Sequence, residues 1–209
     1  MRISLIGMSN IGKSYLARHL AATKGFTHIN CDRMIEEKLG VELAKEGYVG
    51  TAGMARWMGF PYEPHYKKHS GLYTNAESAI MRDVFAHLNH DKNISAVIDT
   101  TGSVIYCSED ILENLRAATT VIYLEASEEH INALFKNFIA HPKPVIWGES
   151  FKPRVGESND QALQRYYPEL LLYRMQHYRN LAHSTIPYEQ HQNRKKEIWS
   201  VIAEQIKEL

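Results

Sequence analysis

The stretch that decides the fold is Gly7-Met8-Ser9-Asn10-Ile11-Gly12-Lys13-Ser14, near the start of the chain. It fits the pattern G-x-x-x-x-G-K-[ST], which binds phosphate when it lies between a strand and a helix. Both are predicted here, because an apolar run precedes the stretch and a helical pattern follows it. The glycines let backbone N–H groups turn inward, and the helix N-terminus adds positive potential. The sequence therefore predicts a site for a nucleoside triphosphate.

The positions of this phosphate loop have separate predicted parts. Lys13 is expected to reach the β- and γ-phosphates, and the Ser14 hydroxyl is expected to hold Mg²⁺. ATP is the expected phosphoryl donor and Mg the expected cofactor, although the sequence does not decide between ATP and GTP. The residues expected to contact the nucleotide are Gly7, Ser9, Asn10, Ile11, Gly12, Lys13, Ser14 and Tyr15.

The composition is that of an ordinary globular α/β protein. The 209 residues are 44% hydrophobic, and 24 basic residues balance 24 acidic ones. No global field attracts nucleic acid or a membrane, so neither is an expected partner. The expected state is a monomer or weak dimer. Two cysteines without a disulfide framework, and the lack of a signal peptide, favour a cytoplasmic location. His65 and His69 lie one helical turn apart, but no acidic third ligand follows at zinc-site spacing.

Strand and helix patterns alternate along the chain, which indicates a parallel sheet covered by helices on both faces. The expected arrangement is one kinase domain over 1–209, with a substrate-binding insert at about 40–74 and a lid at about 141–156. Pro168 is expected to break or kink a late helix. Strands are expected at 2–6, 27–30, 94–98, 120–124 and 184–188. Helices are expected from the phosphate loop to 24 and at 34–39, 75–90, 108–117, 127–140, 160–182 and 194–209.

Two acids lie where expected strands end. Asp99 follows a buried-looking strand, as the Mg²⁺-side acid of many phosphate-loop proteins does, and Asp32 follows the second strand at the same sheet edge. Asp32 is the candidate base or hydroxyl-orienting carboxylate. The alternatives are local: Asp99 would only cap a turn, and Asp32 would cap the next helix.

Cations in the second half of the chain are candidates for the transferring phosphoryl group and the substrate. Lys143 is expected to close over ATP from the lid, with Lys152 and Arg154 as weaker candidates; the alternative is a solvated surface. Arg174 is expected to grip a substrate anion, and the alternative is an ion pair with Glu169. The aromatic cluster at 57–66 would line a substrate pocket or pack a local core.

With these residues in order, the chain resembles the shikimate kinases, a group of P-loop kinases similar to nucleoside-monophosphate kinases. The resemblance implies the sheet order 2-3-1-4-5 and a three-layer P-loop kinase fold. It also implies that Asp32 contacts the acceptor hydroxyl, that Lys143 acts from the lid, and that Gly102 and Arg174 bind substrate. The motifs that carry it are Gly7–Ser14, Asn30-Cys31-Asp32 with Ile35-Glu36, Val121–Glu125, Lys143-Pro144-Val145-Ile146, and Arg174 with Tyr178 and Ala182.

Three departures separate this chain from that family pattern. Asn30 replaces a metal-side Asp, Thr74 replaces the Arg that holds the shikimate carboxylate, and Thr101-Gly102-Ser103 replaces Gly-Gly-Gly. Loss of a bidentate Arg clamp predicts a different acceptor. The expected function is ATP- and Mg-dependent phosphorylation of a hydroxyl on a small molecule. The alternatives are a shikimate kinase that uses Arg56 or Arg82 as its clamp, and a nucleotide-binding protein without kinase activity.

Overall fold

The computed structural model describes residues 1–127, 134, 136, 138, 140, 143–148, 151–193 and 197–207. Its centre is a five-stranded parallel sheet in the order β2-β3-β1-β4-β5, which confirms the order expected from the resemblance. Because all strands run the same way, their carboxyl ends meet at one edge, where open α/β sheets bind ligands. The strands are β1 (Arg2–Ile6), β2 (Thr27–Asn30), β3 (Ala96–Asp99), β4 (Thr120–Leu124) and β5 (Ser184–Ile186).

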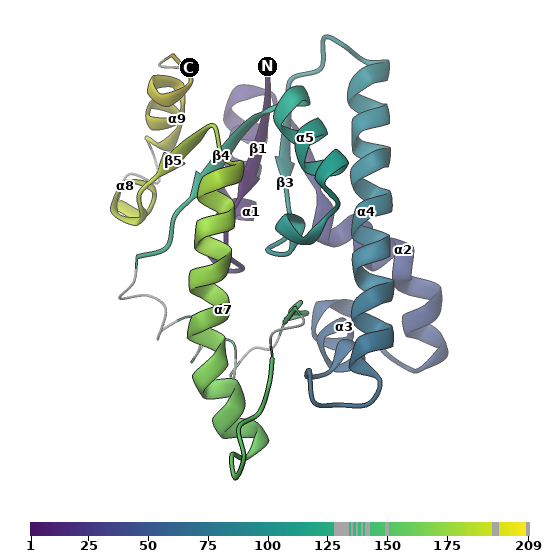
Figure 1. Cartoon of the computed structure of the whole chain (residues 1–209). Helices are drawn as coiled ribbons and strands as arrows, with labels where there is room; N and C mark the ends of the chain where they lie inside the picture. The colour runs from purple at the N-terminus through teal and green to yellow at the C-terminus, as the bar shows by residue number, and fades with distance from the viewer. Residues whose placement is uncertain are drawn as a thin grey trace.

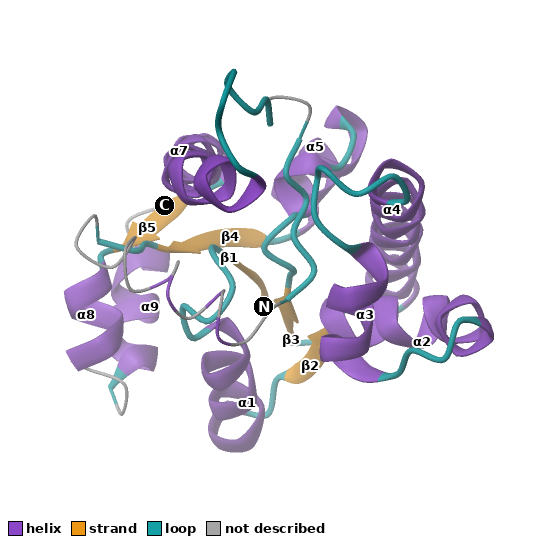
Figure 2. Cartoon of the chain, turned by 90° about the horizontal axis from the view of Figure 1, so that it is seen from below, coloured by secondary structure: helices purple, strands orange, loops and turns teal. Residues whose placement is uncertain are grey.

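Helices cover both faces of the sheet and form the outer two layers (Figures 1 and 2). In Figure 2, α4, α5 and α7 lie on one face, and α1, α8 and α9 lie on the other. Helices α2 and α3 extend beyond the β2 edge and pack toward α4 (Figure 1). The helices are α1 (Lys13–Lys24), α2 (Cys31–Lys45), α3 (Gly50–Met58), α4 (Tyr66–His90), α5 (Glu109–Ala118), α7 (Asn159–Leu181), α8 (Tyr188–Asn193) and α9 (Ile198–Lys207), with a 3₁₀ turn, η1 (Val104–Tyr106).

The regular elements differ from expectation mainly in the predicted insert. Helix α2 is longer than 34–39, α4 begins nine residues before 75, and α3 occupies a stretch that glycines made unreadable. Tertiary packing of their apolar faces overrides the weak local propensity. Helix α7 continues through Pro168, so the expected break there is wrong. The expected helix at 127–140 lies largely outside the described residues. Within the expected helix at 194–209, the described part contains α9, Ile198–Lys207.

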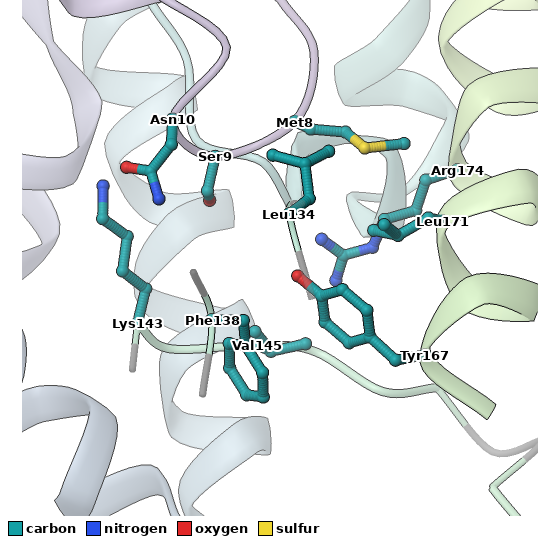
Figure 3. A pocket seen from close by; sticks show the side chains of 10 residues that line it. All are labelled: Met8, Ser9, Asn10, Leu134, Phe138, Lys143, Val145, Tyr167, Leu171 and Arg174. Atoms are coloured by element: carbon teal, nitrogen blue, oxygen red, sulfur yellow. The ribbon is translucent and has the colours of Figure 1, made fainter. Parts of the chain in front are cut away.

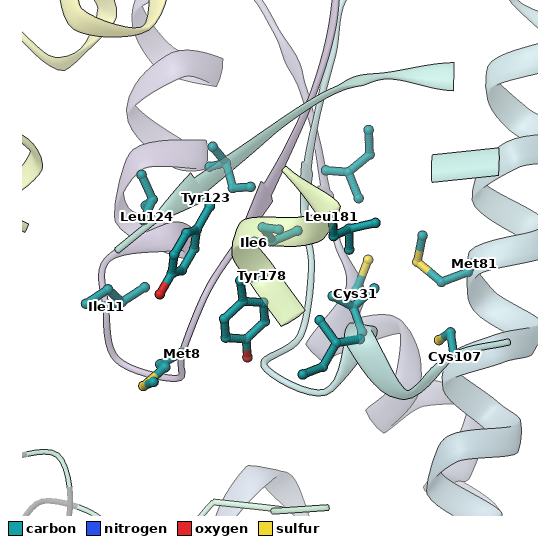
Figure 4. Packing of buried hydrophobic residues seen from close by; sticks show 14 of the residues in the cluster. Ile6, Met8, Ile11, Cys31, Met81, Cys107, Tyr123, Leu124, Tyr178 and Leu181 are labelled. Atoms are coloured by element: carbon teal, nitrogen blue, oxygen red, sulfur yellow. The ribbon is translucent and has the colours of Figure 1, made fainter. Parts of the chain in front are cut away.

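The core lies between the sheet and its two helical layers (Figure 4). Central strands are apolar on both faces, as a doubly covered parallel sheet requires; Ile3, Leu5 and Ile6 of β1 are fully buried. Both thiols are in this core, and burial raises the pKa of Cys31 well above its usual value and that of Cys107 to about 12. Neither cysteine is therefore suited to act as a thiolate nucleophile.

Candidate active site

The phosphate loop connects β1 to α1 and has the strained backbone that its glycines permit. Gly7 and Gly12 have φ of 140° and 114°, and Asn10 is a non-glycine residue at φ 65°. A Cβ at position 7 would lie 2.7 Å from the Leu124 carbonyl oxygen on β4, so only glycine fits against that strand. The requirement at Gly7 comes from close packing as well as from backbone conformation.

The Lys13 side chain lies against the backbone of the phosphate loop. Its Nζ donates to the carbonyl oxygens of Gly7 and Met8, at 2.8 and 2.9 Å, and its side chain is buried. Burial lowers the pKa of Lys13, while the charges of Asp32 and Asp99 raise it. The ammonium is thus held at the loop beside two acids, where a triphosphate would offer stronger, charged acceptors.

Asp99 and Asn30 lie side by side at the carboxyl edge of the sheet. Their Cα atoms are register partners across β2 and β3. Asp99 is 1% exposed and its Oδ1 has no hydrogen-bond partner among the described residues, while Oδ2 lies 3.4 Å from His28 Nε2. A buried carboxylate oxygen without a partner fits a cation ligand. Asp99 therefore places a carboxylate one strand away from position 30, where the family pattern has its metal-side acid.

Asp32 lies in the first turn of α2 but does not cap the helix. The cap is Asn30, whose Oδ1 accepts from the Arg33 backbone N–H at 2.8 Å. This corrects the alternative in which Asp32 capped the helix, and it gives Asn30 a structural part. The Asp32 side chain is open to solvent, yet the protein atoms around it raise its pKa, and Lys13 opposes that shift. An accessible carboxylate beside Lys13 has the position that a hydroxyl-orienting group needs.

Lys143 lies opposite the phosphate loop across a small pocket (Figure 3). Its side chain extends toward Asn10, and its charge lowers the pKa values of both Lys13 and Asp32. The segment 143–148 is held from α4: the Tyr66 hydroxyl accepts from the Trp147 N–H at 2.7 Å and lies 3.2 Å from the Val145 carbonyl oxygen. Tyr66, which sequence reasoning grouped with the aromatic cluster, is therefore what positions the segment that carries Lys143.

Arg174 binds the protein's own backbone. Its guanidinium donates to the Gly102 carbonyl oxygen at 3.3 Å and to the Ile146 carbonyl oxygen at 2.7 Å, and it is 5% exposed. Gly102 also approaches the phosphate loop, since a Cβ there would lie 3.1 Å from Ser9 Oγ. Arg174 lines the pocket of Figure 3, but it acts in this structure as a link between α7, the β3 loop and the segment 143–148. The Glu169 carboxylate pairs with Arg165 instead, at 3.9 Å.

A buried carboxyl group next to this site was not among the predicted site residues. Glu77 of α4 is 1% exposed, and it accepts hydrogen bonds from the hydroxyls of Thr101 and Ser103. Burial raises the pKa of Glu77 to about 7, and the nearby Asp32 charge adds to this. A signal was present in the sequence: Glu77 interrupts the apolar stripe of α4 at a position one turn after Tyr73 and one turn before Ile80.

The two alternative clamp arginines are in different surroundings. Arg56 of α3 is exposed and lines a cavity together with Lys143, whereas Arg82 forms an exposed pair with Asp110 of α5, at 3.9 Å. The side chains of Lys152 and Arg154 are exposed, as in the solvated-surface alternative.

Helix α8 borders a second cavity beside the phosphate loop. Its volume is about 190 Å³, and its walls include Tyr15, Leu16, Leu124 and Ile198. The Gln192 side-chain amide donates to the Ile11 carbonyl oxygen at 3.1 Å and so ties α8 to the loop. An apolar slot with a few polar groups, adjoining a phosphate loop, suits a nucleotide base. Sequence reasoning missed Gln192, because nothing local relates it to residue 11.

In the part of the chain that the structure describes, no group of three or more His, Cys, Asp and Glu side chains could hold a metal ion. Of the described helices, none combines the length and apolar character that crossing a bilayer requires.

Comparison with known structures decides the fold. A shikimate kinase from Bacteroides thetaiotaomicron superposes with a TM-score of 0.62 at 19% identity, over 100% of this chain and 99% of that one. The shikimate kinase from Acinetobacter baumannii, solved in complex with shikimate, has a TM-score of 0.60 at 21% identity, over 88% of this chain and 82% of that one. The chain has the shikimate kinase fold. For the fold, these matches confirm the resemblance that the order of the sequence motifs indicated.

Sequence comparison is weaker than the structural match. No family model matches the sequence. A shikimate kinase from Paracidovorax citrulli (strain AAC00-1) is 26% identical over 131 residues, which cover 63% of this chain and 59% of that relative. The match thus spans less than two thirds of the relative's length. A shared fold does not establish a shared reaction, so the chemistry of this chain depends on the side chains at its sheet edge.

Proposed function

We propose that the chain is an ATP-dependent phosphotransferase that phosphorylates a hydroxyl group of a small molecule. The observation that carries this proposal is the set of charged side chains at the carboxyl edge of the sheet. Lys13 is buried in the phosphate loop, Asp32 and Asp99 lie where β2 and β3 end, and Lys143 lines the pocket beside the loop. Phosphoryl transfer needs this combination of cations on the phosphates and a carboxylate on the acceptor. In this proposal residues 1–209 form one kinase domain, with the substrate insert at about 40–74 and the lid at about 141–156.

The proposed roles follow from these positions. Asp32 orients the acceptor hydroxyl and takes its proton as that oxygen bonds to the γ-phosphorus. The bond from the γ-phosphorus to the β–γ bridging oxygen breaks, and ADP leaves with that oxygen. Lys13 and Lys143 stabilise the charge on the transferring group, with the phosphates held by the backbone of the loop.

Mg²⁺ fits this site through residues of the chain itself. Ser14 follows Lys13 in the first turn of α1, and Asp99 offers a buried carboxylate oxygen, Oδ1, that has no partner among the described residues. Bound there, Mg²⁺ would neutralise phosphate charge. Asp99 and Ser14 are the residues proposed to hold it.

The relatives bear the name shikimate kinase, which makes shikimate the first acceptor to test. Thr74 argues against it, since its hydroxyl is taken up by the α4 carbonyl oxygens of Ser70 and Gly71, both at 3.1 Å. A threonine in that state offers no charge to a carboxylate.

The test is turnover of labelled ATP by the purified protein with shikimate and with a pool of small hydroxyl compounds. Lys13→Ala and Asp32→Asn should each reduce product formation at least about 100-fold, because each removes a group that acts in the transition state. Glu37→Gln, on an exposed site of α2, is the matched control and should keep full activity. A Lys13→Ala variant as active as the control would contradict the proposal. Tight ATP binding without turnover on any acceptor would favour a nucleotide-binding protein instead.

A further inference from the structure

A cavity of about 170 Å³ lies between α3 and the segment 143–148. Phe138, Lys143 and Val145 line both this cavity and the phosphate-loop pocket of Figure 3, so the two spaces adjoin. A molecule in the cavity would lie next to Lys143, whose charge is felt at Asp32 and Lys13. The cavity is thus within reach of the groups proposed to transfer phosphate.

Part of the cavity wall is aromatic. Phe60, Phe138 and Trp147 line it, and Phe138 contacts the other two rings edge-on, with centroids 6.3 and 5.8 Å apart. Hydroxyl groups of a polyhydroxylated ring that lie against the faces of these rings would lose their hydrogen bonds to water. The volume is close to the roughly 150 Å³ that accommodates benzene in an engineered apolar cavity. The cavity therefore suits one apolar ring.

Three charged side chains also line the cavity: Arg56, Glu63 and Lys143. The Arg56 guanidinium has no ion-pair or hydrogen-bond partner in the described part of the chain and is exposed at the cavity wall. Glu63 also lines the cavity, but its Oε2 already accepts from the Phe60 N–H at 2.7 Å. Arg56 is thus available to an anion, and Lys143 marks the end nearest the phosphate loop.

We propose that this cavity binds the acceptor, and that the acceptor is an alcohol built on one apolar ring that carries one anionic group. The ring packs on the aromatic walls, the anion pairs with Arg56, and the hydroxyl points toward Lys143 and Asp32. This inference rests on the proposed function and narrows its substrate class. It assigns to Arg56 the anion that Thr74 cannot bind, and it separates the acceptor from the polyhydroxylated ring of shikimate.

The experiment is calorimetric titration of the full chain, saturated with a non-hydrolysable ATP analogue, with three probes. These are 4-(hydroxymethyl)benzoate, its uncharged counterpart benzyl alcohol, and shikimate. The expected order is tightest binding for 4-(hydroxymethyl)benzoate. Arg56→Gln should weaken that probe about 10-fold and leave benzyl alcohol within about 2-fold, because only the first probe carries an anion. Arg82→Gln, an exposed arginine of α4 outside the cavity, is the matched control and should change neither.

Three results would overturn the inference: tighter binding of shikimate than of 4-(hydroxymethyl)benzoate, equal effects of Arg56→Gln and Arg82→Gln, or no binding of either aromatic probe. The proposed function has a separate readout in the same experiment, which is binding of the ATP analogue itself. If the analogue binds and the aromatic probes do not, only the substrate class is wrong. If the analogue does not bind, the proposed function fails as well.

Discussion

At the scale of single residues, the site owes its properties to polar groups buried at the end of the sheet. Glu77 is the clearest case, because its buried carboxyl group has two hydroxyl donors among the described residues, and its pKa rises to about 7. Burial also lowers the pKa of Lys13, and the protein atoms around the solvent-exposed Asp32 raise the pKa of that carboxyl group. A cluster of ionisable groups with shifted pKa values is typical of functional sites.

Glu77 predicts a pH dependence of stability. Its folded pKa lies above the ordinary value of 4.5, so the folded state binds more protons than the unfolded state between about pH 4.5 and 7. The stabilisation from this group is complete below pH 4.5 and falls as the pH rises toward 7, by at most about 3 kcal/mol. Glu77→Gln cannot ionise and should be more stable relative to the wild type at pH 8 than at pH 5. Urea unfolding of both proteins at the two pH values measures the difference, and an unchanged difference would refute this account.

At the scale of elements, the predicted lid is tied to the helix that faces it. Tyr66 at the start of α4 bonds to the backbone on both sides of Ile146, and Arg174 of α7 bonds to Ile146 itself. These contacts fix the segment 143–148 between two helices. Lys143 therefore faces the phosphate loop from a segment that both helices hold in place. This segment is the described part of the predicted lid that carries Lys143.

Tyr66→Phe should loosen this segment without unfolding the protein. The change removes one hydroxyl and leaves the Trp147 N–H without its acceptor, at a cost of about 1–3 kcal/mol. Hydrogen exchange at the Trp147 amide should become at least about 10-fold faster, and phosphoryl transfer should slow because Lys143 is less well placed. Tyr62→Phe, a half-buried tyrosine outside these bonds, is the control. Exchange at Trp147 that matches the control would show that Tyr66 does not hold the segment.

At the scale of the whole molecule, the phosphate loop is supported by parts of the chain far from it in sequence. The Leu124 carbonyl oxygen of β4 excludes any side chain at Gly7, and Gln192 of α8 bonds to Ile11 across 181 residues. Helix α8 therefore contributes to the proposed nucleotide site as well as to the outer layer.

Gln192→Ala is expected to weaken nucleotide binding while leaving chemistry intact. The side chain steadies the loop next to the proposed base cavity but does not touch the proposed transferring group, so KM for ATP should rise about 3- to 10-fold with kcat nearly unchanged. Steady-state kinetics with varied ATP measures this split. Gln190→Ala on the exposed side of the same helix is the control. A loss confined to kcat would place Gln192 elsewhere in the mechanism.

The sequence by itself determined the phosphate loop, the parallel α/β class and the strand order, the last through a resemblance. A local sequence pattern is enough for this, because a glycine-rich turn between a strand and a helix can be recognised within about twenty residues. The helices of the predicted insert were harder to predict. Glycines break the helical pattern of α3, and tertiary packing extends α4 back to Tyr66.

Only the tertiary structure decided which side chains meet. It put Asp99 beside Asn30, turned Arg174 onto backbone carbonyl oxygens and buried Glu77. It also placed Arg56 at a cavity, with no ion-pair or hydrogen-bond partner among the described residues. The physical reason is that burial and hydrogen-bond partners are set by segments distant along the chain. A residue's type limits what chemistry it can perform, and its neighbours in space decide which groups remain free to perform it.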